Sequence, residues 1–163
     1  MNQTKRTPRG GFTIIEVVLV LAIAGLIFLM VFIALPALQR SQRDTQRRDD
    51  IARLGTAITQ YQTNNNGRLP ATKDNDTTFV TNYLTRNGDS FNDPLSDNSY
   101  QVNFKDFDAK GGATNSYDNG TYIINVYKKA ACNGEVITSS KNSRNYAIFY
   151  NLEGSGVYCE DNS

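Results

Sequence analysis

The sequence contains no histidine, and this absence narrows the chemistry that the chain can perform. Catalytic triads that use an imidazole base and zinc sites built on imidazole are both excluded. A glycine-rich phosphate-binding loop is also lacking. We therefore expect a protein that is not an enzyme and that holds no cofactor of its own.

Long hydrophobic runs are absent from most of the chain and concentrated in one stretch. Residues 17–38 form a run of 22 residues without a charged side chain, and no later stretch comes close. At about 1.5 Å per residue, a helix of this length covers the roughly 30 Å hydrocarbon core of a bilayer. We predict one spanning helix over residues 12–38 and one globular domain, residues 39–163, on a single side of the membrane.

Cysteine is scarce: only Cys132 and Cys159 are present, and both lie in the predicted globular domain. An even count in an exported domain suggests one disulfide and an oxidising compartment. Two free thiols in a cytoplasmic domain are the alternative. The positive-inside rule does not decide on which side of the membrane the globular domain lies. The basic residues after the span outnumber the three in the leader, residues 1–11.

The hydrophobic periodicity after the span predicts a helix followed by a sheet. Apolar residues recur at helical spacing over 51–61, and the Asn-Asn-Asn-Gly run at 64–67 ends the helix at about Thr63. A connecting region over 64–98 contains one short helix. Alternating and β-branched stretches then predict strands at 100–104, 121–128, 145–152 and 156–160. The expected fold class is α+β, a long helix packed on a C-terminal antiparallel sheet, with the packing beginning near Ile51.

The start of the domain carries a mixed-charge segment. Arg40, Arg43 and Arg47 fall near one helix face, and acidic residues are interspersed among them, namely Asp44, Asp49 and Asp50. Such a pattern is typical of a solvated helix with surface salt bridges. Contacts with anionic lipid, or with acids of adjacent subunits, are the functional alternatives.

A single carboxylate, Glu16, lies at the start of the apolar run. A charge inside a span costs roughly 2.5–3.5 kcal/mol on insertion scales, and a solvated position at the headgroup level is the simplest explanation. The residues around Glu16 indicate a further role for this carboxylate. The stretch "RGGFTIIEVVLVLAIAGLI" resembles the processing and assembly signature of type IV pilins and pseudopilins, with a basic leader, a glycine, Phe-Thr, two aliphatic residues and Glu before a long apolar helix.

This resemblance implies a sequence of events at the N terminus. A prepilin peptidase would cut between Gly11 and Phe12 on the cytoplasmic side, and the new amino group of Phe12 would be N-methylated. Glu16 of an incoming subunit would then pair with the Phe12 amine of a neighbour in the filament. The resemblance also implies that Gly25 and Pro36 interrupt the helix, Pro36 by removing a backbone hydrogen bond.

The resemblance further implies the function and the location. We expect a subunit of a type IV pilus filament that supports adhesion, motility or DNA uptake, or alternatively a minor pilin or pseudopilin at a fibre tip that binds a surface, DNA or a secreted substrate. Its partners would be copies of itself, other pilins, the prepilin peptidase, membrane lipid, and an assembly platform with a cytoplasmic ATPase. The chain would be a single-pass membrane protein with a cytoplasmic N terminus before it enters an extracellular filament.

Two further patterns in the sequence are weaker and concern calcium and nucleic acid. Asp89, Asp93 and Asp97 lie close together and could offer oxygen ligands to calcium, although turn-forming residues produce the same pattern without a metal. Lys128 and Lys129 are too few to indicate nucleic-acid binding, and the domain as a whole is not basic.

Overall fold

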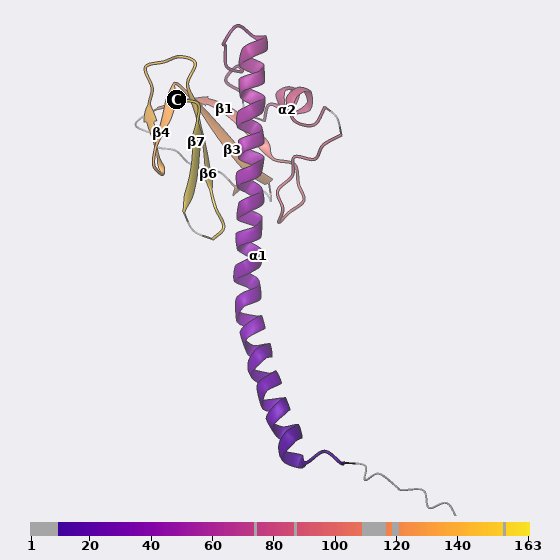
Figure 1. Ribbon diagram of the computed structural model, residues 1–163. Coiled ribbons are helices and arrows are strands. Elements are labelled where there is room, and N and C mark those ends of the chain that lie inside the picture. Colours follow the sequence, from indigo (N-terminus) through magenta and orange to yellow (C-terminus); the bar gives the residue numbers. More distant parts are fainter. Residues whose placement is uncertain (1–9, 74, 87, 109–116, 119–120, 155) are drawn as a thin grey trace, which may run out of the picture. The chain divides into compact units, whose positions relative to one another are not determined.

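The computed structural model describes residues 10–73, 75–86, 88–108, 117–118, 121–154 and 156–163. The basic leader before residue 10 lies outside the described residues. The chain divides into two compact units, Met1–Gln39 and Arg40–Ser163, and each is described by itself below. The element order, a long helix followed by a short helix and strands, confirms the α+β fold class (Figure 1).

Helix α1 spans Ile14–Asn64. It ends as the sequence predicts, because Asn66 and Gly67 both adopt positive φ and the Gly67 amide donates a hydrogen bond of 2.7 Å back to the Gln62 carbonyl. In the single chain α1 is continuous through both Gly25 and Pro36, and the interruption implied for these residues stays a prediction. A proline removes only one hydrogen bond of the helix ladder, and the bonds of the turns on either side keep the helix intact.

Helix α2, Thr77–Tyr83, is the short helix predicted in the connecting region. The Asp76 side chain caps it by accepting a hydrogen bond of 3.1 Å from the Phe79 amide. Phe79 is buried and contacts the ring of Phe104 edge-on. The helix ends at Tyr83, and the Leu84 amide donates to the Val80 carbonyl at its C-cap.

The four predicted strands are confirmed within a few residues at each end. The strands of the structure are β1 Gln101–Asp106, β2 Tyr117–Asp118, β3 Thr121–Lys128, β4 Ala130–Asn133, β5 Val136–Ser139, β6 Tyr146–Asn151 and β7 Val157–Asp161. The main sheet has the order β1-β3-β6-β7, and β2 pairs with β3. The β3-β6-β7 pairs are antiparallel as predicted, whereas β1 and β3 are parallel. The long connection over 107–120 permits this return, since parallel neighbours require a crossover of about a dozen residues.

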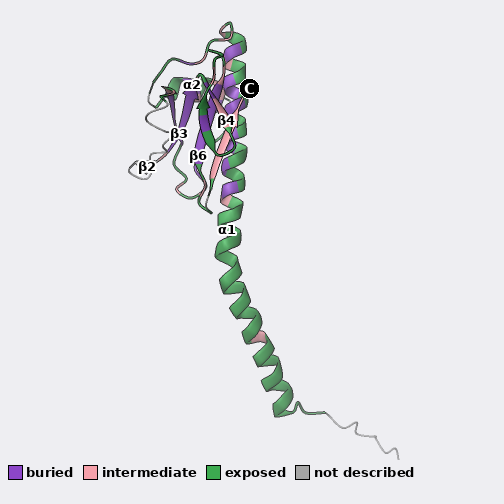
Figure 2. Ribbon diagram, turned by 90° about the vertical axis from the view of Figure 1, so that its left-hand side faces the viewer, coloured by how far each residue is buried: buried purple, intermediate pink, exposed green. Residues whose placement is uncertain are grey.

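One face of the sheet packs on α1 (Figure 2). Ile51, Leu54 and Ile58 of the helix are almost fully buried, which confirms the predicted stripe. Alternating residues of the predicted strands belong to the same core cluster, namely Tyr100, Val102, Phe104, Ile124, Val126, Tyr146, Ile148 and Tyr150. Packing begins one to two turns earlier than predicted, because Asp44 and Arg47 are already buried.

The opposite face of the sheet is covered by the β4–β5 hairpin, which lies between two of the predicted strands and is not among them. Ala130 and Ile137 of the hairpin form a second core cluster with Tyr127 and Phe149 of the sheet. Gly134, with a positive φ at the first position of the two-residue turn between two β-prone stretches, is a hairpin signal that could have revealed it.

The predicted disulfide is confirmed and joins this hairpin to the sheet. Cys132 of β4 is bonded to Cys159 of β7, with the two Cα atoms 5.9 Å apart. The amide of Cys132 also donates a hydrogen bond to the Asp161 carboxylate. The bond therefore links the layer over the second face to the edge strand of the sheet.

We predict that replacing both cysteines by serine lowers the free energy of unfolding by about 3–4 kcal/mol, because the unfolded chain regains the freedom of the closed loop. Guanidinium unfolding of the full-length chain in detergent, followed by near-ultraviolet circular dichroism of its tyrosines, measures the change. Amide hydrogen exchange should accelerate in β4 and β5 more than in β3. Unchanged stability, or equal acceleration in all strands, would contradict the assigned role.

Candidate functional site

The segment expected to be processed lies outside regular secondary structure. Residues 10–13 precede α1 and have no helical or strand assignment. The Phe12 side chain is 90% exposed, and a Cβ placed on Gly11 would meet no atom within 4 Å. The bond between Gly11 and Phe12 is therefore accessible, and the missing side chain of glycine lets its backbone adopt an extended conformation.

Thr13 and Glu16 form a capping box at the start of α1. The Glu16 carboxylate accepts hydrogen bonds of 2.8 Å from both the amide and the hydroxyl of Thr13, and the Glu16 amide contacts the Thr13 hydroxyl oxygen at 3.4 Å. These contacts satisfy amide groups that the first helical turn leaves free. The sequence reading missed this local role, although the Thr-x-x-Glu spacing is the pattern that predicts it.

The part of α1 in the first unit has an apolar surface on all sides. Its large hydrophobic side chains, from Ile14 to Leu38, are exposed in the single chain (Figure 2). The helix is long and apolar enough to cross a membrane. Apolar surface of this extent in one chain requires a covering of lipid or of other helices.

A buried ion cluster lies where α1 enters the second unit. Arg47 is only 2% exposed and donates to both carboxylate oxygens of Asp93, with Nε–Oδ2 at 2.9 Å and Nη2–Oδ1 at 3.4 Å. Its Nη1 donates to Asp44 and Glu153, each at 3.2 Å. The guanidinium carbon also lies 5.0 Å from the ring centre of Tyr122. The expectation that Arg47 belongs to a solvated helix face is therefore wrong.

The reason for this burial is the helix period. Arg47 lies four residues before Ile51 and seven before Leu54, so it occupies the same face of α1 as the apolar stripe. Burial opposes its charge, but the hydrogen bonds with Asp93 and the surrounding ionised groups outweigh burial and raise the pKa of Arg47 above its ordinary value. A guanidinium in this setting stays charged at all physiological pH values.

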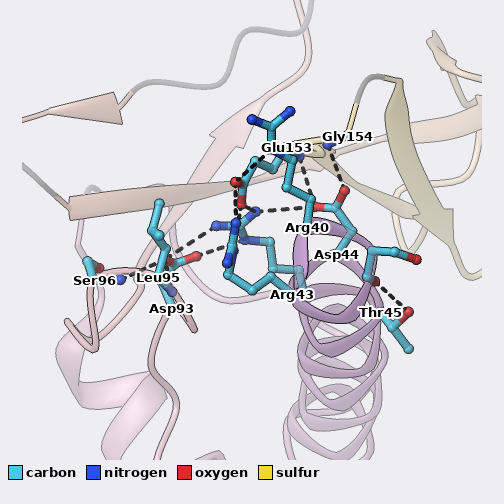
Figure 3. Close-up of polar contacts among 11 residues, drawn as sticks. Arg40, Arg43, Asp44, Thr45, Asp93, Leu95, Ser96, Glu153 and Gly154 are labelled. Atoms are coloured by element: carbon cyan, nitrogen blue, oxygen red, sulfur yellow. Dashed lines mark hydrogen bonds and ion pairs between the residues drawn. The ribbon is translucent and has the colours of Figure 1, made fainter. Parts of the chain in front are cut away.

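The other members of the cluster hold the β6–β7 connection. The Asp44 carboxylate accepts the amides of Glu153 and Gly154, both at 2.8 Å (Figure 3). Arg43 donates twice to the Glu153 carboxylate, with distances of 2.8 and 2.6 Å. The Arg43 hydrogen bonds lower the pKa of Glu153 to about 2. The cluster thus joins α1 to two connecting segments that lie far apart in the sequence.

The candidate calcium ligands lie in a different arrangement from a shared metal site. Asp93 is buried, is paired with Arg47, and accepts the amides of Leu95 and Ser96 at 2.9 and 3.2 Å. Asp89 and Asp97 are exposed. Within the described residues, no group of three or more acidic or cysteine side chains could hold a metal ion. Asp93 is therefore paired with the Arg47 guanidinium. Calcium binding by these three aspartates stays a prediction.

Comparison with known proteins bears on the N terminus. Residues 6–32 match the model of the prokaryotic N-terminal methylation motif, so the type IV prepilin-like signature is confirmed. Neither the search of curated proteins nor the search of solved structures found a match to this chain. The motif supports a type IV pilin-like or pseudopilin-like protein, and proteins of this kind are structural rather than enzymatic. It implies assembly with other pilins, and the apolar helix fits membrane anchoring.

We predict that Arg47→Met lowers the free energy of unfolding by about 3–5 kcal/mol, because it leaves buried carboxylates without a cation. The exposed Arg40→Met should cost no more than about 1 kcal/mol. The double variant Arg47→Met/Asp93→Asn should recover part of the loss, since it removes both charges and keeps a side-chain oxygen for the Leu95 and Ser96 amides. Denaturant unfolding of the full-length chain measures all three. Equal losses for the two arginine variants would contradict the role of the cluster.

We also predict an acid-dependent contribution from Glu153. Its pKa in the folded protein, about 2, lies below that of the unfolded chain, so its contribution is present above the unfolded pKa and is lost as the pH falls toward 2. The stability difference between the native protein and Glu153→Gln should therefore be largest near neutral pH and shrink on acidification. Glu135→Gln, on the exposed β4–β5 turn, is the matched control. A pH-independent difference for Glu153→Gln would refute the pairing with Arg43.

Proposed function

We propose that the protein is a structural subunit of a type IV pilus filament. It is held in the membrane by the first half of α1, cleaved after Gly11, N-methylated at Phe12, and assembled with further copies through the same helix. The observation that carries this proposal is the methylation motif at residues 6–32 followed directly by a helix that exposes apolar side chains on every face.

The exposed helix supports two successive roles. In the membrane, lipid covers its apolar side chains. In a filament, the helices of neighbouring subunits replace the lipid, so no apolar surface returns to water. The soluble unit Arg40–Ser163 has its own cores and contributes the outer part of the filament.

The capping box sharpens the role of Glu16. Cleavage makes Phe12 the first residue and creates a cationic amine next to Thr13, whose amide and hydroxyl already hold the Glu16 carboxylate. Thr13 stays in the mature chain, so the carboxylate remains directed toward the helix N terminus. There it can receive the Phe12 amine of an adjacent subunit. Because an unpaired charge is costly in a dry filament core, this pair favours the correct register between subunits.

The proposed life cycle defines the partners. A prepilin peptidase cuts and methylates the chain at the cytoplasmic face, and an assembly platform with a cytoplasmic ATPase supplies the work of extraction. The second unit lies outside the cytoplasm, and the Cys132–Cys159 disulfide supports this placement, because such bonds persist in oxidising compartments.

The proposal predicts that the mature chain begins at Phe12 and carries one added methyl group on its amine. Mass spectrometry of the chain from purified filaments measures both features. A mature chain that retains residues 1–11 would overturn the proposal. If the chain is processed but is present at only a few copies in fibres built from another pilin, it is a minor subunit, and the role of major subunit is refuted.

Two variants separate the charge of Glu16 from its capping role. Glu16→Gln removes the charge and keeps a side chain that can cap the helix, whereas Thr13→Val removes the hydroxyl and keeps the charge. We expect normal processing in both and a loss of filament incorporation mainly in Glu16→Gln. The same incorporation defect in the two variants would show that capping, rather than charge pairing, is what assembly requires.

A further inference from the structure

We propose that the second unit binds an oligosaccharide in a groove between α1 and α2 with the residues that follow α2. The groove consists of two adjoining hollows of about 220 and 540 Å³ that share Gln60 and Tyr83 as lining residues. All of its lining residues belong to the Arg40–Ser163 unit. This binding role goes beyond the structural role proposed above, because it assigns a ligand class to the second unit.

One wall of the groove is a line of residues on α1. Arg53, Thr56, Gln60 and Asn64 follow one another at spacings of three or four residues, so they share one face of the helix. At about 1.5 Å per residue, this line is about 16 Å long. That length suits a chain of several linked sugar rings better than a single sugar.

An aromatic ring that the core holds in place lies at the centre of the groove. Tyr83 stacks on the buried Phe79, with ring centres 5.3 Å apart and planes 17° from parallel. The Tyr61 ring of α1 contacts Tyr83 edge-on at 5.4 Å, where α2 lies beside α1 (Figure 1). Tyr83 is half-buried, and its remaining surface lines both hollows. A ring fixed in this way is a preformed platform for the apolar C–H face of a pyranose.

Side-chain amides surround this platform. Gln60 and Asn64 of α1 and Asn82 of α2 are exposed, and no hydrogen bond joins their side chains to another described residue. Each amide offers two donor hydrogens and an acceptor oxygen. A sugar hydroxyl also both donates and accepts, so the neighbouring hydroxyls of a sugar match these amides without either partner carrying a charge.

The charges at the groove favour a sugar over other occupants. Arg53 donates to the Asp50 carboxylate at 3.4 Å and to the Ser90 carbonyl at 3.2 Å, so its guanidinium is already engaged. The other charged lining residues, Arg86 and Asp89, are of opposite sign. Nucleic acid requires a run of cations, and an extended peptide binds by adding to a strand edge. The lining of the groove contains neither a cation run nor a strand residue.

The test measures saturation-transfer difference NMR spectra with the full-length chain in nanodiscs of phosphatidylcholine, which carry no sugar. The probes are maltohexaose, laminarihexaose and chitohexaose, and a short DNA duplex is the probe that is not a sugar. We expect at least one hexasaccharide to receive saturation at its ring C–H protons, because these protons lie against Tyr83. We expect the DNA duplex to receive none.

A matched pair of variants locates the binding. Thr56→Trp places a large ring in the groove, and Thr63→Trp is the control. Both threonines are exposed on α1, and each hydroxyl donates at 3.0 Å to the carbonyl four residues earlier, but Thr63 does not line the groove. We expect Thr56→Trp to abolish the binding and Thr63→Trp to leave it unchanged. Gln60→Ala should weaken it about fivefold, whereas Tyr83→Phe should retain it because the ring stays.

Each other outcome overturns the proposal in a defined way. Absence of saturation transfer to all three hexasaccharides refutes sugar binding. Transfer that persists equally in Thr56→Trp and Thr63→Trp places the sugar outside the groove and refutes the site. A signal from the DNA duplex that Thr56→Trp removes assigns the groove to nucleic acid and refutes the ligand class. None of these results bears on the filament role, which the mature N terminus tests separately.

Discussion

The ion pair between Arg47 and Asp93 is the interaction on which the entry of α1 into the globular unit depends. Both side chains are almost completely buried, so neither charge can be satisfied by water if the other is displaced. The pair therefore requires that the helix and the 93–97 turn meet in one arrangement. Through Asp44 and Glu153 the same cluster requires the β6–β7 connection to lie there as well. A purely apolar contact would tolerate small shifts that this network does not.

Helix α1 suits two different environments because the chemical character of its surface changes along its length. Up to Leu38 it is apolar all round and suits lipid or other helices, whereas beyond Arg40 only one face is buried. On that face, charged residues come first and apolar residues follow. The change in surface, rather than a break in the helix, divides the chain into two units.

The candidate site at the N terminus was largely predictable. The motif around Gly11, Phe12 and Glu16 is local in sequence, and its recognition needs no tertiary contacts. The capping box is also encoded locally, in the spacing of Thr13 and Glu16. The charge pattern of the helical residues in the ion cluster predicts a solvated helix face instead. Its residues share a helix face with the apolar stripe, which the charge pattern alone conceals.

The sequence alone determined the long helix and its end, the four main strands, the disulfide and the prepilin-like motif. Each of these depends on local periodicity, on turn chemistry or on a count of cysteines. Only the tertiary structure decided the parallel pairing of β1 with β3, the packing of the β4–β5 hairpin on the second face of the sheet, and the partners of Arg47. The physical reason is the same in each case. Strand order and the partners of a buried charge depend on groups that are distant in sequence, and a local pattern does not contain them.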